Sequence, residues 1–221
     1  MKKLLSLLIS LVAIGGAVGG ASSAQAQDAK AGQKKVDMCI GCHGIPGYQA
    51  TFPQVYKVPM IAGQNAKYIV AALTEYQKGE RKHPTMRAIA TSLTEQDMND
   101  VAAFYEQQGK DAGGAVPGPI GTPPAAIAEL LKKGNCQSCH GDNFNKPIDP
   151  SYPKLAGQHA SYLFVALKAY QIEKGSLVGR GNAIMGGMAK PFSHAELKQL
   201  ADYIGSLPTE LKTVEQSHFR P

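Results

Sequence analysis

The sequence predicts an all-α protein of two tandem helical domains, and three observations support this fold class. A Cys-x-x-Cys-His pattern occurs twice in the 221-residue chain, and the same short motifs follow each copy. Apolar residues recur at helical spacing through both copies, without the alternation typical of half-buried strands. A segment rich in Gly and Pro, which favours neither helix nor strand, separates the copies.

The first 26 residues have the three parts of a secretory signal peptide. A basic start is followed by an apolar run over residues 4–18 and by the small-residue cleavage site Ala24-Gln-Ala26. The apolar run is short for a membrane span, which needs about 20 residues. We therefore expect residues 1–26 to be cleaved and the protein to be exported to the periplasm.

The charge of the chain argues against nucleic-acid binding. The formal net charge is +6, and two of the lysines belong to the predicted leader. The rest of the chain has no dense run of Lys and Arg with interleaved aromatic residues. We therefore expect no nucleic-acid partner.

The internal repeat divides the exported chain. The first copy reads Cys39-Ile-Gly-Cys-His43, Pro59-Met-Ile-Ala-Gly-Gln64, Tyr68, Leu73 and Tyr76, and the second reads Cys136-Gln-Ser-Cys-His140, Pro153-Lys-Leu-Ala-Gly-Gln158, Tyr162, Leu167 and Tyr170. We expect an N-terminal domain over residues 27–108, a Gly/Pro-rich linker over 109–124, and a C-terminal domain with a short tail over 125–221.

Helix signals recur in both domains. Segments 29–38 and 125–133 are predicted helices before the two Cys-x-x-Cys-His motifs, and segments 65–78 and 161–172 are predicted helices after them. The last helix of each half begins at a capping-box pattern, Thr94-Glu-Gln-Asp97 or Ser193-His-Ala-Glu196. Each half would have a thin core by itself, and a large apolar cofactor would complete it.

The two Cys-x-x-Cys-His motifs predict covalent attachment of two c-type haems. The two thiols of each motif add to the porphyrin vinyl groups, and the adjacent His then lies where it can bind the iron. Cys39, Cys42 and His43 would hold haem 1. A zinc half-site, a redox dithiol and a disulfide are alternatives, but two matches in register with a repeat favour haem.

The equivalent site in the second half consists of Cys136, Cys139 and His140. As the second axial ligands we expect Met86 for haem 1 and Met185 for haem 2. Met86 precedes its helix cap by the same number of residues as Met185 precedes its own. Met188 is the alternative to Met185, and His83 and His159 are rival ligands without equivalents in the repeat. Thioether ligation raises the reduction potential and leaves no open position on the iron.

The sequence also offers candidates for the groups that contact the histidine ligands and the haem propionates. The carbonyls of Pro59 and Pro153 are candidate acceptors for the second ring N–H of the two histidines. Arg81, Arg87 and Arg180 are candidate partners for the haem propionates, although solvated surface charge is the expected role of each.

These motifs resemble those of the diheme cytochrome c4 family. The resemblance covers nearly the whole exported chain and implies two tandem cytochrome c-like domains, each wrapped around one covalent haem with His/Met coordination. It also implies a pseudo-twofold arrangement with the propionate edges of the haems facing each other. The second half departs from the first by about five extra residues around 175–181, and the tail from Thr209 has no counterpart.

The resemblance further implies a periplasmic electron carrier that is not an enzyme, with a quinol-oxidising complex or a dehydrogenase as donor and a terminal oxidase as acceptor. We expect a monomer that can associate peripherally with a membrane. The alternative is a diheme subunit of a periplasmic dehydrogenase, such as a flavocytochrome sulfide dehydrogenase. A diheme peroxidase is a third reading, disfavoured by the equivalent Met candidates in both halves.

Overall fold

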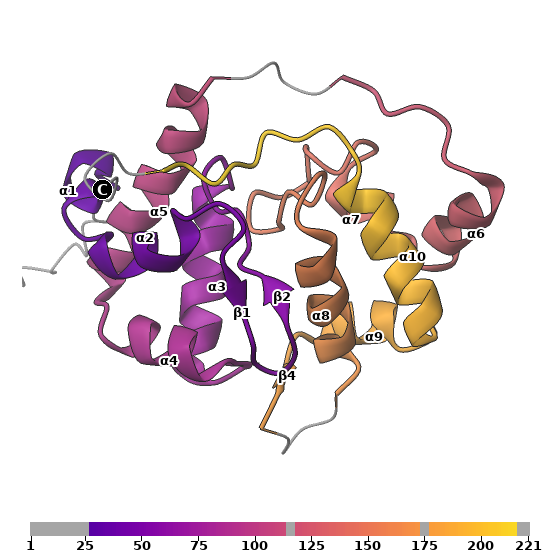
Figure 1. Ribbon diagram of the computed structural model, residues 1–221, viewed down its shortest axis with the longest axis horizontal. Helices are drawn as coiled ribbons and strands as arrows, with labels where there is room; N and C mark the ends of the chain where they lie inside the picture. The colour runs from indigo at the N-terminus through magenta and orange to yellow at the C-terminus, as the bar shows by residue number, and fades with distance from the viewer. Residues whose placement is uncertain (1–26, 114–117, 173–176, 216–221) are drawn as a thin grey trace, which may run out of the picture.

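The computed structural model describes residues 27–113, 118–172 and 177–215, so the predicted leader lies outside the described residues. The described chain is mainly helical, which confirms the predicted all-α class (Figure 1). Its helices are α1 (Ala29–Gln33), α2 (Asp37–His43), α3 (Ala66–Lys78), α4 (Pro84–Thr91), α5 (Glu95–Asp111), α6 (Ala125–Lys133), α7 (Gln137–His140), α8 (Ala160–Tyr170), α9 (Ala183–Ala189) and α10 (His194–Gly205).

The helices form two bodies side by side (Figure 1). In the first, α1 packs on α5, and α3 packs on both α4 and α5. In the second, α10 packs on α6 and α8. Each body has its own cluster of buried apolar side chains, centred on residues such as Ile40 and Val101 in the first and Leu197 and Leu200 in the second.

Both predicted capping boxes are present. Thr94 accepts a hydrogen bond from the Asp97 N–H and Ser193 accepts one from the Glu196 N–H, and in each box the acidic side chain returns a bond to the cap backbone. These bonds satisfy N–H groups that otherwise lack partners at a helix start. The start of α5 and the start of α10 are thus fixed by equivalent local chemistry.

The predicted single helix over residues 29–38 is instead two helices, α1 and α2. The chain turns between them, and this turn buries Val36 and Ile40 against the first core. The first helix ends one residue after Gly32, and the burial of two apolar side chains accompanies the break.

Four two-residue strands were not predicted. β1 (Gln49–Ala50) pairs with β2 (Tyr56–Lys57) within the first half. β3 (Arg81–Lys82) pairs antiparallel with β4 (Gly179–Arg180), which belongs to the second half. Strands of two residues are too short to show an alternating pattern in the sequence. The β3–β4 pair joins the two halves.

Helix α5 continues to Asp111, so the extended segment begins later than the predicted linker start at Gly109. Two backbones approach each other closely near this end of the helix. Gly63 donates its N–H to the carbonyl of Tyr105 at 2.9 Å, and a Cβ on Gly109 would lie 2.1 Å from the Cα of Gly63. The contact therefore requires a residue without a side chain at position 109.

The C-terminal tail crosses from the second half to the first. In Figure 1 it runs from the end of α10 toward α5. Lys212 forms an antiparallel bridge with Ala62, Leu211 is 2% exposed, and the Lys212 ammonium donates to the carbonyl of Ala112 at 3.1 Å. The tail therefore lies across the first domain as far as the structure describes it.

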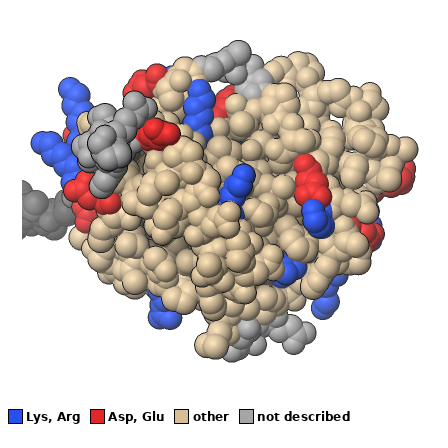
Figure 2. Space-filling view, in the orientation of Figure 1, with Lys and Arg blue, Asp and Glu red and all other residues tan. Residues whose placement is uncertain are grey.

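The surface in Figure 2 is mostly uncharged, with Lys, Arg, Asp and Glu lying singly or in small groups. No helix among the described residues is long and apolar enough to cross a bilayer.

We predict that Gly109→Ala destabilises the protein by about 1–3 kcal/mol, because the added methyl group overpacks the contact with Gly63. Helix propensity by itself would favour Ala by about 1 kcal/mol. Thermal unfolding measures the change. Gly118→Ala is the control, because its added Cβ meets nothing within 4 Å. Equal stability of the two variants would contradict the proposed steric role.

Candidate functional site

The two Cys-x-x-Cys-His motifs lie on equivalent short helices. Cys39, Cys42 and His43 lie on α2. Cys139 and His140 lie on α7, and Cys136 is its N-cap residue. Residues three apart on a helix lie on one face, so each motif places both thiols on the same side. All four cysteines are free thiols.

Burial shifts the pKa of two of these thiols. Desolvation raises the pKa of Cys39 and of Cys136 to about 11. Each of these residues is the first cysteine of its motif. The first cysteine is therefore in a similarly desolvated environment in both halves.

The two motif histidines are held in one tautomer by backbone carbonyls. His43 Nδ1 lies 2.8 Å from the carbonyl oxygen of Pro59, and His140 Nδ1 lies 3.1 Å from that of Pro153. A carbonyl only accepts, so Nδ1 must donate, and Nε2 keeps its lone pair free for a metal. The predicted acceptors Pro59 and Pro153 are confirmed.

Burial also keeps these histidines neutral. Desolvation is the main effect that lowers the pKa of His43 and of His140, and the hydrogen bonds that the two rings donate to the Pro carbonyls oppose it. A neutral imidazole is the form that ligates iron. The histidine chemistry in each half therefore suits a metal ligand before any metal is bound.

A cavity of about 350 Å³ lies beside the first motif. This volume falls in the range of roughly 300–1,000 Å³ typical of cofactor sites. Cys42, His43 and Met86 all line it, so the structure brings together residues that are far apart in the sequence. Residues of the second half, including Leu155 and Tyr162, complete its wall.

The two predicted Met ligands lie on short helices that the sequence did not predict. Met86 is on α4 and Met185 is on α9. The N-cap residues are equivalent: His83 Nδ1 accepts from the Met86 N–H at 3.3 Å, and Asn182 Oδ1 accepts from the Met185 N–H at 3.0 Å. A polar residue three positions before each Met was the signal for these helices.

The rival residues occupy different places. Met188 is 44% exposed, whereas Met185 is partly buried. His83 lines the cavity, and its Nε2 is buried without a hydrogen-bond partner among the described residues. His159 is the N-cap residue of α8. An unpaired polar atom at a cavity wall fits a site that receives a polar group of a cofactor.

Arg81 and Arg180 are not the solvated surface charges that the sequence suggested. They face each other across the β3–β4 pair between the two halves, and Arg81 is only 5% exposed. Arg81 forms an ion pair with Glu75, while Arg87 is exposed as expected.

Aromatic rings enclose both guanidinium groups. Arg81 lies over the rings of Tyr68 and Tyr76, 5.3 and 5.7 Å from their centroids. Arg180 lies over its own pair of tyrosines at 5.5 and 5.3 Å; these rings belong to Tyr162 and Tyr170. The four tyrosines are equivalent positions of the repeat, so their recurrence was the sequence signal for this cluster.

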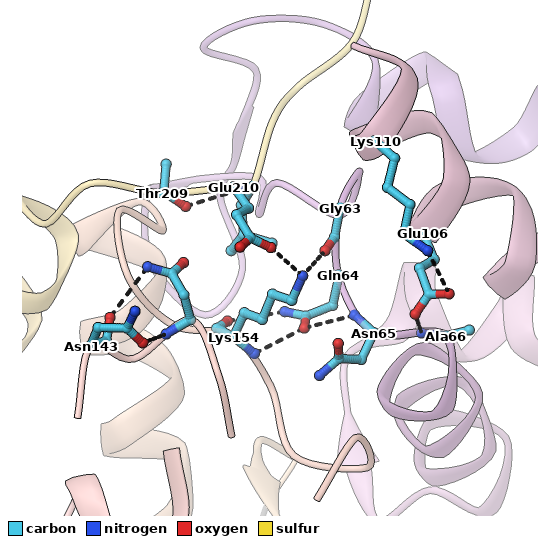
Figure 3. A network of polar contacts seen from close by, with 12 residues as sticks. Gly63, Gln64, Asn65, Ala66, Glu106, Lys110, Asn143, Lys154, Thr209 and Glu210 are labelled. Carbon is cyan, nitrogen blue, oxygen red and sulfur yellow. Dashed lines mark hydrogen bonds and ion pairs between the residues drawn. The ribbon is translucent and has the colours of Figure 1, made fainter. Parts of the chain in front are cut away.

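Interface contacts also come from side chains for which the sequence pattern indicated no role. Gln64 and Gln158, which are 3% and 4% exposed, bind backbone of the opposite half. Lys154 reaches the carbonyl of Gly63 at 2.8 Å and the carboxylate of Glu210 at 2.6 Å (Figure 3). The two Gln residues were part of the repeated Ala-Gly-Gln motif, but spacing does not show that they cross the interface.

Comparison with known proteins gives a consistent result. The sequence profile of the Cytochrome c family matches residues 29–108 and 124–208. The chain is 31% identical to cytochrome c4 of Pseudomonas aeruginosa, over 91% of this chain and 98% of that protein. It is 32% identical to cytochrome c4 of Stutzerimonas stutzeri, over 93% of this chain and 99% of that protein.

A solved structure and a further relative show the same similarity to diheme electron-transfer proteins. The crystal structure of reduced recombinant cytochrome c4 from Pseudomonas stutzeri matches with a TM-score of 0.57 and 27% identity, covering 83% of this chain and 100% of that one. The thiosulfate dehydrogenase electron acceptor of Stutzerimonas stutzeri strain A1501 is 31% identical, over 76% of this chain and 78% of that protein.

We predict that Arg81→Met destabilises the protein by about 1–3 kcal/mol, because the Glu75 carboxylate loses its partner at a largely buried position. Arg87→Met at the exposed position is the control and should change stability by less than about 0.5 kcal/mol. Thermal unfolding of both variants measures the difference. An Arg81 variant with unchanged thermal stability would show that the buried ion pair contributes little to the free energy of unfolding.

Proposed function

The chain belongs to the cytochrome c4 family of diheme c-type cytochromes, and on this premise we propose that it carries electrons in a periplasmic respiratory chain. Its general role is that of an electron-transfer protein with two covalent haem groups. The proposed donor is the quinol-oxidising side of the chain and the proposed acceptor is a terminal oxidase. The predicted leader over residues 1–26 supports export.

The residues present fit a haem in each half. In the first half, the thiols of Cys39 and Cys42 would form the thioethers, and His43 and Met86 would bind the iron. The observation that supports this most directly is the cavity that His43, Met86 and Cys42 share, with His43 fixed as a neutral Nδ1–H tautomer. When bound, the haem supplies an iron that alternates between the ferric and ferrous states.

The second half repeats this set with Cys136, Cys139, His140 and Met185. The Nδ1–H of His140 is held by Pro153, as that of His43 is by Pro59. The partly buried position of Met185 and its cap by Asn182 support it over the exposed Met188. A thioether at both irons would leave no open coordination position, which suits electron transfer without bond-breaking chemistry.

A second candidate function is acceptance of electrons from a periplasmic dehydrogenase. The similarity to a thiosulfate dehydrogenase electron acceptor favours it. The two functions differ in the donor, so they are separated by mixing the oxidised protein with thiosulfate dehydrogenase and thiosulfate, or with a quinol-oxidising complex and quinol. The donor that reduces both haems rapidly identifies the role.

We predict that an anaerobic optical redox titration of the purified protein shows two waves at positive potential and that carbon monoxide does not bind the reduced form. Two closed His/Met sites give this result because sulfur ligation favours ferrous iron. A haem of low potential, or one that binds carbon monoxide, would indicate an open iron. That result would favour an enzymatic role over electron transfer alone.

We predict that Met86→Ala lowers the potential of haem 1 and lets carbon monoxide bind it, because the variant lacks the thioether. Met185→Ala should have the same effect on haem 2, and Met188→Ala should have none. Met38→Ala is a surface control, since Met38 is 54% exposed. Carbon monoxide binding by the Met188 variant would reassign the ligand of haem 2.

A further inference from the structure

One peptide group lies between His43 and a glutamine of the other half. The carbonyl of the Pro59–Met60 peptide accepts from His43 Nδ1–H at 2.8 Å. The N–H of the same peptide donates to Gln158 Oε1 at 3.0 Å. Gln158 belongs to the second half, so the first motif histidine is connected to the opposite domain through a single amide.

The second half has the same arrangement with the partners exchanged. The carbonyl of the Pro153–Lys154 peptide accepts from His140 Nδ1–H at 3.1 Å. The N–H of this peptide donates to Gln64 Oε1 at 2.9 Å, as Figure 3 shows for Gln64 and Lys154. The two connections therefore cross between the halves.

Additional hydrogen bonds fix the orientation of both glutamine amides. Gln158 Nε2 donates to the carbonyl of Met60 at 2.9 Å, and Gln64 Nε2 donates to that of Lys154 at 3.0 Å. Each Oε1 also accepts the N–H of the residue that follows it in the sequence. Asn65 donates to Gln64 Oε1 and His159 donates to Gln158 Oε1, each at 3.0 Å. A flipped amide would direct NH₂ groups at two N–H donors, so only one orientation satisfies all partners.

Hydrogen bonds that share a peptide group strengthen one another. An acceptor on the N–H polarises the amide and makes its carbonyl a better acceptor. A stronger bond to the Nδ1–H of a ligating histidine raises the basicity of that ligand and favours the more positively charged metal. The low exposure of both glutamines, 3% and 4%, preserves these effects from competition with water.

We propose that Gln64 and Gln158 are positioning residues that act crosswise: each glutamine sets the hydrogen bond of the motif histidine in the other half and thereby tunes the reduction potential of that haem. The inference rests on the proposed ligation by His43 and His140. By linkage, the ferric state in turn tightens the glutamine contact, so oxidation strengthens the interface between the halves.

The test is a redox titration of the full-length holoprotein carrying Gln64→Leu or Gln158→Leu. Each haem is identified by the NMR signals of its ferric methyl groups. Gln158→Leu should raise the potential of haem 1 and Gln64→Leu that of haem 2, by about threefold to tenfold in the equilibrium constant for reduction, at most about 59 mV for one electron. The Nδ1 proton signal of the affected histidine should move upfield in the reduced protein.

Gln64 and Gln158 both line the cavity proposed for haem 1, so a haem 1 shift in Gln158→Leu fits either a crosswise or a packing effect, and only Gln64→Leu separates the two. If Gln64 acted only through packing or polarity there, its removal would shift haem 1. A shift confined to haem 1, or an equal shift of both haems, in Gln64→Leu would overturn the proposal.

Two matched controls remove a hydrogen bond across the same interface without touching a histidine acceptor. Asn65→Ala removes the bond from Asn65 to the carbonyl of Tyr152, and Ser161→Ala removes the bond from the Lys57 N–H. Neither should shift a single haem selectively. A selective shift equal to that of the glutamine variants would assign the effect to the interface as a whole and overturn the specific role.

A second substitution keeps the proposal testable if the Leu variants fold poorly. Gln64→Glu retains an oxygen on the Lys154 N–H and adds negative charge, so it should lower the potential of haem 2, the opposite sign to Leu. Because the position also lines the cavity proposed for haem 1, the added charge should lower that potential too. Signals of two low-spin His/Met haems in the unmodified protein test the proposed ligation separately. If these signals are present and the crossed shifts are absent, only the crosswise role fails.

Discussion

The buried amides of Gln64 and Gln158 are the contact on which the relation between the two halves depends. A buried polar group without partners costs about 1–3 kcal/mol, and these two side chains find their partners on the backbone of the opposite half. Their hydrogen bonds therefore join the two domains at two equivalent points of the repeat. The contacts are reciprocal: each glutamine Nε2 donates to a carbonyl of the opposite half.

Other contacts complete the interface between the two halves. The β3–β4 pair brings Arg81 opposite Arg180, and tyrosines from the repeated positions enclose both guanidinium groups. Side chains of the second half complete the wall of the cavity beside His43. The tail from Thr209 then crosses to the first half, where Lys212 pairs with Ala62. The second half thus contributes both to the wall of the first half's cavity and to the surface of the first half.

Local patterns predicted much of the fold because the forces that define them act over a few residues. The helix over 125–133 and the capping boxes at Thr94 and Ser193 were predicted from cap chemistry and apolar spacing, and all are present. The failures have tertiary causes. The break between α1 and α2 buries Val36, and α5 extends through Gly109 to Asp111 where its backbone contacts Gly63.

The sequence by itself determined that the protein carries two covalent haems on two similar helical domains, and it named the Pro carbonyls that hold the motif histidines. These features depend on side chains adjacent in the chain or on a repeat that can be aligned by eye. Only the tertiary structure decided that Arg81 is buried and that the glutamine contacts cross between the halves. Periodicity describes which face of an element is apolar, whereas contacts between domains depend on how two completed surfaces fit together.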